Sequence, residues 1–317
     1  MAKNILVLLP VDENEKRILE EKAPGCSFTY ASHKTLTTEM VHNANIIIGN
    51  PSVDRVKGSK NLEWLQLDSA GVGGFTNEGV LRDGVVFTNM SGAYGLAISE
   101  YMLGVLLAMF KKLHYYRDNQ AKAKWQYEGN VKAVYNSTAL VIGLGDIGGE
   151  FAKRLKALGA YTIGIRRANL DKPDYLDELH LMEDLESLLP KADIVALSLP
   201  ATNLTNKIIN KKTLGLMKQD AVLINVGRGT AIDTDDLCDA LESGHLLGAA
   251  MDVTDPEPLP SDHRLWKLKN AIITPHVSGG YSLDETRNRI FKISVDNLEA
   301  FFNGKELRNI VDISAGY

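Results

Sequence analysis

The chain has 317 residues, of which 44% are hydrophobic and 24% charged, and its formal net charge is −5. This length exceeds what one hydrophobic core usually serves, so we expect two domains. The acidic balance and the scattered Lys and Arg residues exclude a basic nucleic-acid footprint. The two cysteines, Cys26 and Cys238, form no C-x-x-C pair, which suits a reducing cytosol.

Two apolar runs bear on location. The N-terminal run ends at Pro10 and fits a first core strand better than a signal sequence. The longest later run, 102–110, is far below the roughly 20 residues that a membrane span needs. We therefore expect a cytoplasmic protein with no membrane and no nucleic-acid partner.

The first part of the chain alternates strand-like and helix-like segments. Such alternation predicts a parallel sheet with helices on its faces, which is an α/β domain in its own right. The predicted strands are 5–9, 27–31, 45–48, 62–67 and 85–88, and the predicted helices are 13–22 and 38–44.

The segment 97–113 is predicted to be a helix that is apolar over much of its circumference. Leu103, Leu106, Phe110 and Leu113 form one stripe along it. Such wide apolar cover indicates packing against more than one partner, as at a domain junction or a subunit interface. A core helix of a single domain is equally compatible with the pattern.

The segment 138–167 is typical of a dinucleotide-binding βαβ unit, with strands at 139–142 and 161–165 and a helix at about 147–158. Gly143 permits the tight turn, Gly145 leaves the backbone open to a pyrophosphate, and Gly148 lets the helix pack close to the sheet. The helix N-terminus offers N–H groups and a positive dipole to the phosphates. An ordinary βα turn is the alternative, but the place of the glycines between strand and helix favours dinucleotide binding.

The βα alternation continues to the end of the chain. Further strands are predicted at 194–199, 221–226, 247–252 and 271–274, with helices at 181–189 and 234–242, which makes six strands in a doubly wound sheet. The helix at 282–302 is expected to return to the first domain. We predict an α/β fold in which a Rossmann-type doubly wound NAD(P)-binding domain, 99–282, is inserted into a smaller flavodoxin-like α/β substrate domain, 1–98 and 283–317.

Three side chains at predicted strand ends could carry chemistry: Arg228 between two glycines, Glu257 between two prolines, and His276 before two glycines. Separately, they could be a solvated Arg, a structural loop acid and a surface His. Together, they suit hydride transfer to a ketone. The His would give a proton to the developing alkoxide, the Glu would orient the imidazole, and the Arg would bind a carboxylate and polarise the carbonyl.

With these motifs, the sequence resembles the D-isomer-specific 2-hydroxyacid dehydrogenase family over nearly its full length, in the manner of glyoxylate/hydroxypyruvate reductases. The resemblance implies an NAD(P)H-dependent 2-oxoacid reductase that acts on a small 2-oxo or 2-hydroxy acid, forms a homodimer and uses no metal. It implies the catalytic residues Arg228, Glu257 and His276. The substrate residues it implies are Ala70, Gly71, Val72 and Arg228. The cofactor residues it implies are Gly143, Gly145, Asp146, Ile147, Gly148, Arg166, Arg167, Pro200, Thr205, Val226 and Asp252.

The sequence departs from the family pattern at two places. Gly73 and Gly74 stand where the family usually has an acidic residue in the substrate loop. Arg166 and Arg167 stand where an NAD enzyme usually has an acid for the adenine ribose, and an Arg pair can bind a 2′-phosphate instead. We therefore expect NADP(H) to be preferred, with NAD(H) possible. Exposed arginines with the nucleotide held elsewhere are the alternative.

Two other functions share this fold. A non-catalytic, dinucleotide-sensing binding protein of the corepressor type would not need the intact Arg, Glu and His set. A formate dehydrogenase would call for an amide at Glu257. The identity of the 2-oxo acid stays open, and Met90, Ser91 and Tyr94 lie near the family's substrate face.

Overall fold

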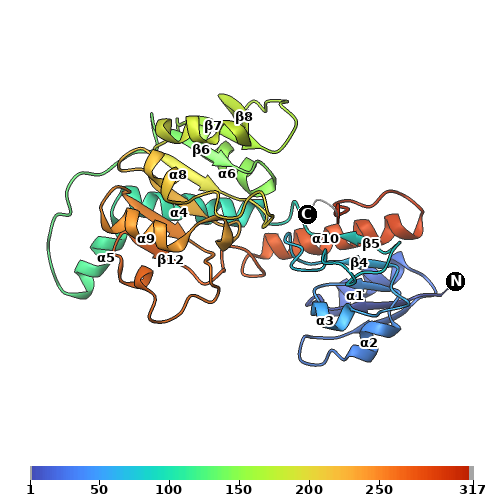
Figure 1. Cartoon of the computed structure of the whole chain (residues 1–317). Coiled ribbons are helices and arrows are strands. Elements are labelled where there is room, and N and C mark those ends of the chain that lie inside the picture. Colours follow the sequence, from blue (N-terminus) through green and yellow to red (C-terminus); the bar gives the residue numbers. More distant parts are fainter. Residues whose placement is uncertain (1, 314–317) are drawn as a thin grey trace. The chain divides into compact units, whose positions relative to one another are not determined.

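The computed structural model describes residues 2–313 and divides into two compact units (Figure 1). Unit 1 comprises Met1–Tyr94 and Gly280–Tyr317, and unit 2 comprises Gly95–Gly279. Each unit is built on one parallel sheet with helices on its faces, so the predicted α/β fold class is confirmed.

Unit 1 has a five-stranded sheet in the order β2-β1-β3-β4-β5, which is the flavodoxin-like order. Its central strand is three consecutive buried isoleucines, as expected for a strand covered on both faces. Its strands are β1 (Asn4–Val7), β2 (Ser27–Tyr30), β3 (Ile46–Ile48), β4 (Trp64–Gln66) and β5 (Val86–Thr88).

The helices of unit 1 include the C-terminal helix of the described chain. They are α1 (Glu13–Lys22), α2 (Thr38–Asn43), α3 (Val53–Val56) and α10 (Asp284–Phe302). Asp12 and Glu15 form a capping box that fixes the start of α1. Helix α10 packs against α1 and covers β4, where Phe301 stacks on Trp64 with ring centroids 5.2 Å apart. Residues from both ends of the chain therefore build this unit.

Unit 2 has a seven-stranded sheet in the order β12-β11-β10-β9-β6-β7-β8, whose direction of winding reverses between β6 and β9. The expected number of strands, six, was wrong. The seventh strand, β8, has the half-buried sequence Glu-Leu-His-Leu at the sheet edge and lacks the apolar run of a central strand. The strands are β6 (Thr138–Ile142), β7 (Tyr161–Arg166), β8 (Glu178–Leu181), β9 (Ile194–Leu197), β10 (Val222–Asn225), β11 (Gly248–Met251) and β12 (Ala271–Ile273).

The α-helices of unit 2 are α4 (Gly95–Phe110), α5 (Leu113–Ala121), α6 (Asp146–Ala157), α7 (Leu185–Leu188), α8 (Lys211–Leu216) and α9 (Thr234–Glu242). The predicted helix 97–113 ends at Phe110, because Lys112 adopts a left-handed backbone with φ of 58°. The predicted helix 181–189 is broken into short turns around α7. Helix α4 packs on α6, β10 and β11, while Leu103 and Leu107 keep part of their surface exposed.

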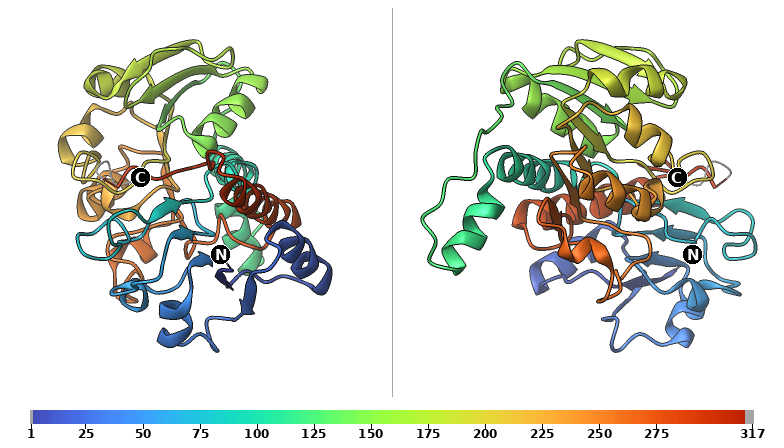
Figure 2. Two further views of the ribbon diagram at one scale, coloured as in Figure 1. Left: turned by 90° about the vertical axis from the view of Figure 1, so that its right-hand side faces the viewer. Right: turned by 60° about the vertical axis from the view of Figure 1, so that its left-hand side comes forward.

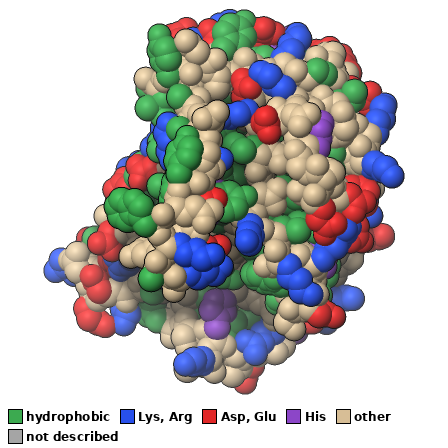
Figure 3. All heavy atoms as spheres, turned by 90° about the vertical axis from the view of Figure 1, so that its left-hand side faces the viewer, with side chains coloured by type: hydrophobic (Ala, Val, Ile, Leu, Met, Phe, Trp, Pro, Cys, Tyr) green, Lys and Arg blue, Asp and Glu red, His purple; other side chains and the backbone are tan. Residues whose placement is uncertain are grey.

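Helix α5 and the segment 122–133 form an arm that stands away from the sheet of unit 2 (Figure 1 and the right view of Figure 2). Trp125, Tyr127 and Val131 of this arm are exposed. Figure 3 shows this side of the molecule, where apolar side chains lie at the surface between charged ones. Within residues 2–313, no helix combines the length and apolar character needed to cross a bilayer.

Candidate functional site

Arg228 follows β10 in a turn that is fixed by side-chain hydrogen bonds and by close backbone packing. The side-chain amide of Asn225 donates to the carbonyl of Arg228 at 2.9 Å, and the Asn225 side-chain oxygen accepts the N–H of Gly227 at 3.0 Å. A Cβ on Gly227 would lie 2.6 Å from the backbone of Leu199, and one on Gly229 would lie 1.9 Å from the carbonyl oxygen of Thr254. Both glycines are therefore needed for close backbone packing, and Asn225 is a supporting residue that the sequence did not single out.

The Arg228 side chain is partly buried beside an acidic group. Burial lowers the pKa of its guanidinium, and the nearby charge of Glu257 opposes that effect. An Arg pKa starts so high that the group stays cationic at neutral pH. Its Nη1 donates to the carbonyl of Gly227 at 2.7 Å, which leaves further N–H donors of the fork for a carboxylate.

His276 and Glu257 are in direct contact. Nδ1 of His276 lies 2.7 Å from Oε1 of Glu257, and the two side chains are 49% and 42% exposed. This bond fixes one ring nitrogen and leaves Nε2 to face a reactant. The structure thus brings the predicted residues Arg228, Glu257 and His276 together in unit 2.

Asp252 is 1% exposed and organises the segment that carries His276. One carboxylate oxygen accepts the Thr274 hydroxyl at 2.6 Å and the N–H of Val277 at 2.9 Å. The other accepts the N–H of Ser278 at 3.1 Å and the Ser278 hydroxyl. The Asp252 carbonyl also accepts the N–H of His276 at 2.8 Å, and that residue has a left-handed φ of 53°. Contact of Asp252 with the cofactor stays a prediction.

A tyrosine of α4 extends this network. The hydroxyl of Tyr101 lies 2.6 Å from that of Thr274, and burial raises the Tyr101 pKa, so the phenol remains a hydrogen-bond donor. Thr274, Ser278 and Tyr101 were not predicted as site residues. A hydroxyl just before Pro275-His276 was the available signal for Thr274, whereas Tyr101 is 173 positions away along the chain.

The glycine turn between β6 and α6 fits a dinucleotide. Gly143 has φ of 95°, and a Cβ on Gly148 would lie 1.9 Å from the Gly143 carbonyl oxygen, so helix and turn touch. A Cβ on Gly145 would meet open space, and no side chain caps the first turn of α6. The open N-terminus is suited to a pyrophosphate. The Asp146 carboxylate accepts the N–H of Gly95 at 2.6 Å and so begins α4, while Ile147 is partly exposed in the same turn.

The other predicted cofactor residues lie at or after the ends of further strands in the sheet of unit 2. Thr205 donates its hydroxyl to the Pro200 carbonyl at 2.7 Å and is itself buried, so it shapes the loop after β9. Val226 is buried directly after β10. Arg166 ends β7 and is partly exposed, and the next residue, Arg167, is exposed.

The predicted substrate loop belongs to unit 1 and follows β4. Ala70 and Gly71 are partly exposed, whereas Val72 is 9% exposed and packs into the core of this unit. The Asn89 side chain donates to the Ala70 carbonyl at 2.9 Å, and Ser69 donates to the Gly71 carbonyl at 2.7 Å.

The two glycines that depart from the family pattern continue this loop. Gly73 and Gly74 have φ of 43° and 83°, which disfavours a side chain at either position. Met90 is 0% exposed and lies in the core of unit 1.

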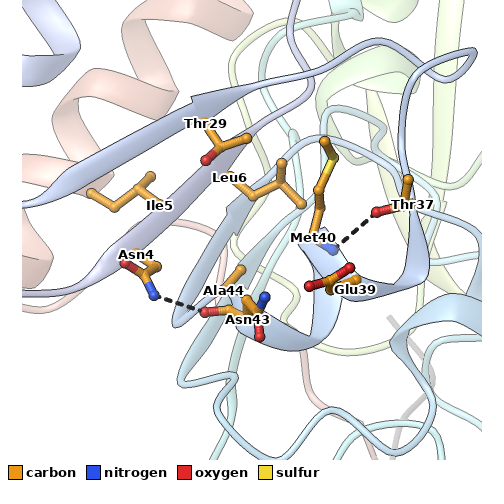
Figure 4. A pocket seen from close by; sticks show the side chains of 9 residues that line it. All are labelled: Asn4, Ile5, Leu6, Thr29, Thr37, Glu39, Met40, Asn43 and Ala44. Atoms are coloured by element: carbon orange, nitrogen blue, oxygen red, sulfur yellow. Dashed lines mark hydrogen bonds between the residues drawn. The ribbon is translucent and has the colours of Figure 1, made fainter.

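Unit 1 also contains a hollow of about 520 Å³ between β1, β2 and α2 (Figure 4). Glu39 is its one charged lining residue, and nearby polar groups bond locally, as where Asn4 donates to the Asn43 carbonyl at 3.1 Å. None of the predicted site residues lines this hollow. It carries no set of groups suited to the predicted chemistry.

The chain is similar in sequence and in structure to known proteins. The profile of the family described as "D-isomer specific 2-hydroxyacid dehydrogenase, NAD binding domain" matches residues 103–278. A glyoxylate reductase of Aeropyrum pernix is 33% identical over 251 residues, which are 75% of this chain and 74% of that protein.

Solved structures show the same fold. A family protein from Aeromonas salmonicida superposes with a TM-score of 0.87 at 30% identity and covers 99% of this chain and 100% of its own. A D-isomer specific 2-hydroxyacid dehydrogenase from Xanthobacter autotrophicus, in complex with NADPH and MES, has a TM-score of 0.83 at 25% identity over 100% of both chains.

The chain therefore belongs to the D-isomer specific 2-hydroxyacid dehydrogenase family. It is an NAD(P)-dependent oxidoreductase that acts on 2-hydroxy acids, as predicted from the sequence.

Proposed function

We propose that the protein is an NADP(H)-preferring 2-oxoacid reductase, equivalently a D-2-hydroxyacid dehydrogenase, with His276 as its acid/base. The observation that carries this proposal is the 2.7 Å bond between Nδ1 of His276 and Oε1 of Glu257, beside a partly buried Arg228. A dinucleotide-sensing corepressor would have no use for a proton donor held in this way.

Each residue of the trio has a distinct role in the proposed reaction. Bound NADPH would supply a hydride to C2 of the 2-oxo acid. Arg228 would bind the substrate carboxylate and polarise the carbonyl with the free part of its guanidinium. His276 would donate the proton on Nε2 to the carbonyl oxygen as it gains charge, while Glu257 keeps Nδ1 fixed. The reverse reaction would return that proton to His276.

The substrate loop and the Arg pair extend the proposal to binding. Backbone N–H groups of Ala70, Gly71 and Val72 would hold the substrate carboxylate. Arg166 and Arg167 would contact the 2′-phosphate of NADP(H), and each charge-assisted bond is worth about 1.5–3 kcal/mol. The substrate would be a small 2-oxo acid such as glyoxylate, hydroxypyruvate or pyruvate, or a bulkier branched one.

We also propose a cytoplasmic homodimer. Exposed apolar residues of the arm, such as Trp125 and Tyr127, and the partly exposed Leu103 and Leu107 of α4 support a subunit interface. Both cysteines are free thiols, which fits a reducing compartment. Sedimentation at several concentrations would test the dimer, and a single monomeric species would contradict it.

The catalytic role of His276 can be tested against a matched histidine. His276→Ala should lower kcat with a 2-oxo acid and NADPH by at least about a hundredfold, the range of general acid–base catalysis. His180 forms a similar pair in the same unit, with Nε2 2.8 Å from Glu178, and His180→Ala should keep its turnover. Full turnover by His276→Ala would contradict the mechanism.

A further inference from the structure

The chain passes between the two units at two places, after Tyr94 and after Gly279. A tyrosine of unit 1 lies beside each crossing: Tyr94 directly before the first, and Tyr281 shortly after the second. The second crossing segment also carries His276, because residues 276–281 form one short stretch without regular secondary structure.

The hydroxyl groups of both tyrosines donate hydrogen bonds to Asp68. Tyr281 donates to Oδ2 of Asp68 at 2.7 Å, and Tyr94 donates to the backbone carbonyl of Asp68. The N–H of Asp68 in turn donates to the Asn50 side chain at 3.0 Å. Asp68 is thus held through its side chain, its carbonyl and its N–H.

The surroundings keep the two tyrosines as donors. Burial raises the pKa of Tyr94 and of Tyr281, and the Asp68 carboxylate raises both further. Burial also raises the pKa of the Asp68 carboxyl, against the bond from Tyr281 and the nearby His33. Both phenols are therefore protonated at neutral pH, and their bonds to Asp68 do not compete with ionisation.

Asp68 stands at the start of the substrate loop. Ser69 follows it, and the Ser69 carbonyl accepts the N–H of Met90 at 3.0 Å. The Asn89 side chain holds the Ala70 carbonyl at 2.9 Å, and residues 89–94 lead directly to Tyr94 and the first crossing. The loop and the first crossing are therefore fastened to each other at two further points.

We propose that Asp68 is a positioning residue that ties the substrate loop, Ser69 to Val72, to both crossing segments and so to the segment carrying His276. The inference rests on the proposed function, in which this loop holds the substrate carboxylate. A displacement of either crossing would then reach the loop through one hydrogen bond. No other tyrosine in the described part of unit 1 bonds to Asp68.

Hydrogen–deuterium exchange and steady-state kinetics of the full chain test this tie. Tyr281→Phe removes one hydroxyl. It should speed exchange in peptides that cover residues 67–76, and it should raise KM for the 2-oxo acid about three- to tenfold. KM for NADPH should stay as in the wild type. Asp68→Ala should have the same effect, and the double variant should be no worse, because both changes remove the same bond.

Tyr30→Phe is the matched control. Tyr30 lies in the same unit, and its hydroxyl donates to the Glu20 carboxylate at 3.1 Å and to the Lys16 carbonyl at 3.4 Å, neither of which belongs to the loop. Removing the Tyr30 hydroxyl should leave hydrogen–deuterium exchange in residues 67–76 and KM for the 2-oxo acid unchanged. Asp68→Asn keeps an acceptor for Tyr281 and should restore most of the wild-type behaviour, which a general folding defect would not allow.

The outcomes separate this inference from the proposed function. If Tyr281→Phe leaves hydrogen–deuterium exchange in residues 67–76 unchanged, the proposed link between Tyr281 and the substrate loop is wrong, whatever the enzymatic activity. Faster exchange with an unchanged KM would overturn the positioning role. If exchange rises while the wild type reduces no 2-oxo acid, the tie stands and the proposed function fails.

Discussion

Replacing Asp252 by Asn should loosen the segment that carries His276. The carboxylate accepts four donors, two on each oxygen, and it is 1% exposed. An amide keeps one accepting oxygen, so it can serve Thr274 and Val277. Its NH2 group would then face the N–H of Ser278, although the Ser278 hydroxyl can rotate and accept. The part-buried backbone N–H of Ser278 therefore loses its acceptor.

A fully buried donor without a partner costs about 1–3 kcal/mol, so the loss of this part-buried bond should lower the free energy of unfolding by up to about that amount. Because the same segment places His276, kcat should fall by at least about tenfold, which corresponds to 1.4 kcal/mol. Urea denaturation followed by circular dichroism would measure the first quantity, and initial rates with NADPH the second.

Asp235→Asn is the control for this substitution. The Asp235 side chain is 79% exposed and lies 3.4 Å from Arg264, so its loss should change stability by less than about 1 kcal/mol. An Asp252→Asn variant with wild-type stability and wild-type kcat would refute the role of Asp252 in ordering the His276 segment.

Three further predictions concern other parts of the structure. Gly229→Ala places a methyl group 1.9 Å from a backbone carbonyl oxygen and should abolish turnover, so wild-type initial rates would contradict this prediction. Gly215→Ala, in open space on α8, should raise the free energy of unfolding by about 0.5–1 kcal/mol, and a variant that is less stable in urea than the wild type would contradict this. Arg166→Ala should raise KM for NADPH by about tenfold or more and leave KM for NADH nearly unchanged, and an equal change for both cofactors in initial-rate assays would argue against a 2′-phosphate contact. Burial raises the pKa of Cys238 to about 11, so a thiol reagent at pH 8 should label the part-exposed Cys26 first, as peptide mass spectrometry would show, and faster labelling of Cys238 would contradict the packing of α9.

Much of the fold could be predicted because the sequence pattern of most segments matches the secondary structure and burial that these segments have in the folded protein. The buried isoleucines of β3 indicate a strand covered on both faces, and the glycines between β6 and α6 indicate a tight turn from strand to helix. Patterns of this kind predict the parallel sheet of each unit. Strand β8 was missed because its polar residues resemble a loop, and only pairing with β7 makes it a strand. Lys112 ended the predicted helix early through a left-handed φ that residue type does not indicate.

The site was predictable where side-chain chemistry follows a strand end. Arg228, Glu257 and His276 were predicted in this way. The structure brings them together, and their catalytic roles stay a prediction. The supporting residues were not predictable, because their partners are distant in sequence. Tyr101 meets Thr274 only once α4 packs in unit 2, and the need for glycine at 229 depends on the backbone of Thr254.

The central claim is most directly tested by initial rates of the purified protein on a panel of 2-oxo acids, including glyoxylate, hydroxypyruvate, pyruvate and a branched 2-oxo acid, with NADPH and NADH. The account predicts loss of reduced cofactor with at least one of these acids and a higher kcat/KM with NADPH than with NADH. A higher kcat/KM with NADH would contradict the NADP(H) preference. Binding of dinucleotide without turnover of any acid would contradict the reductase itself.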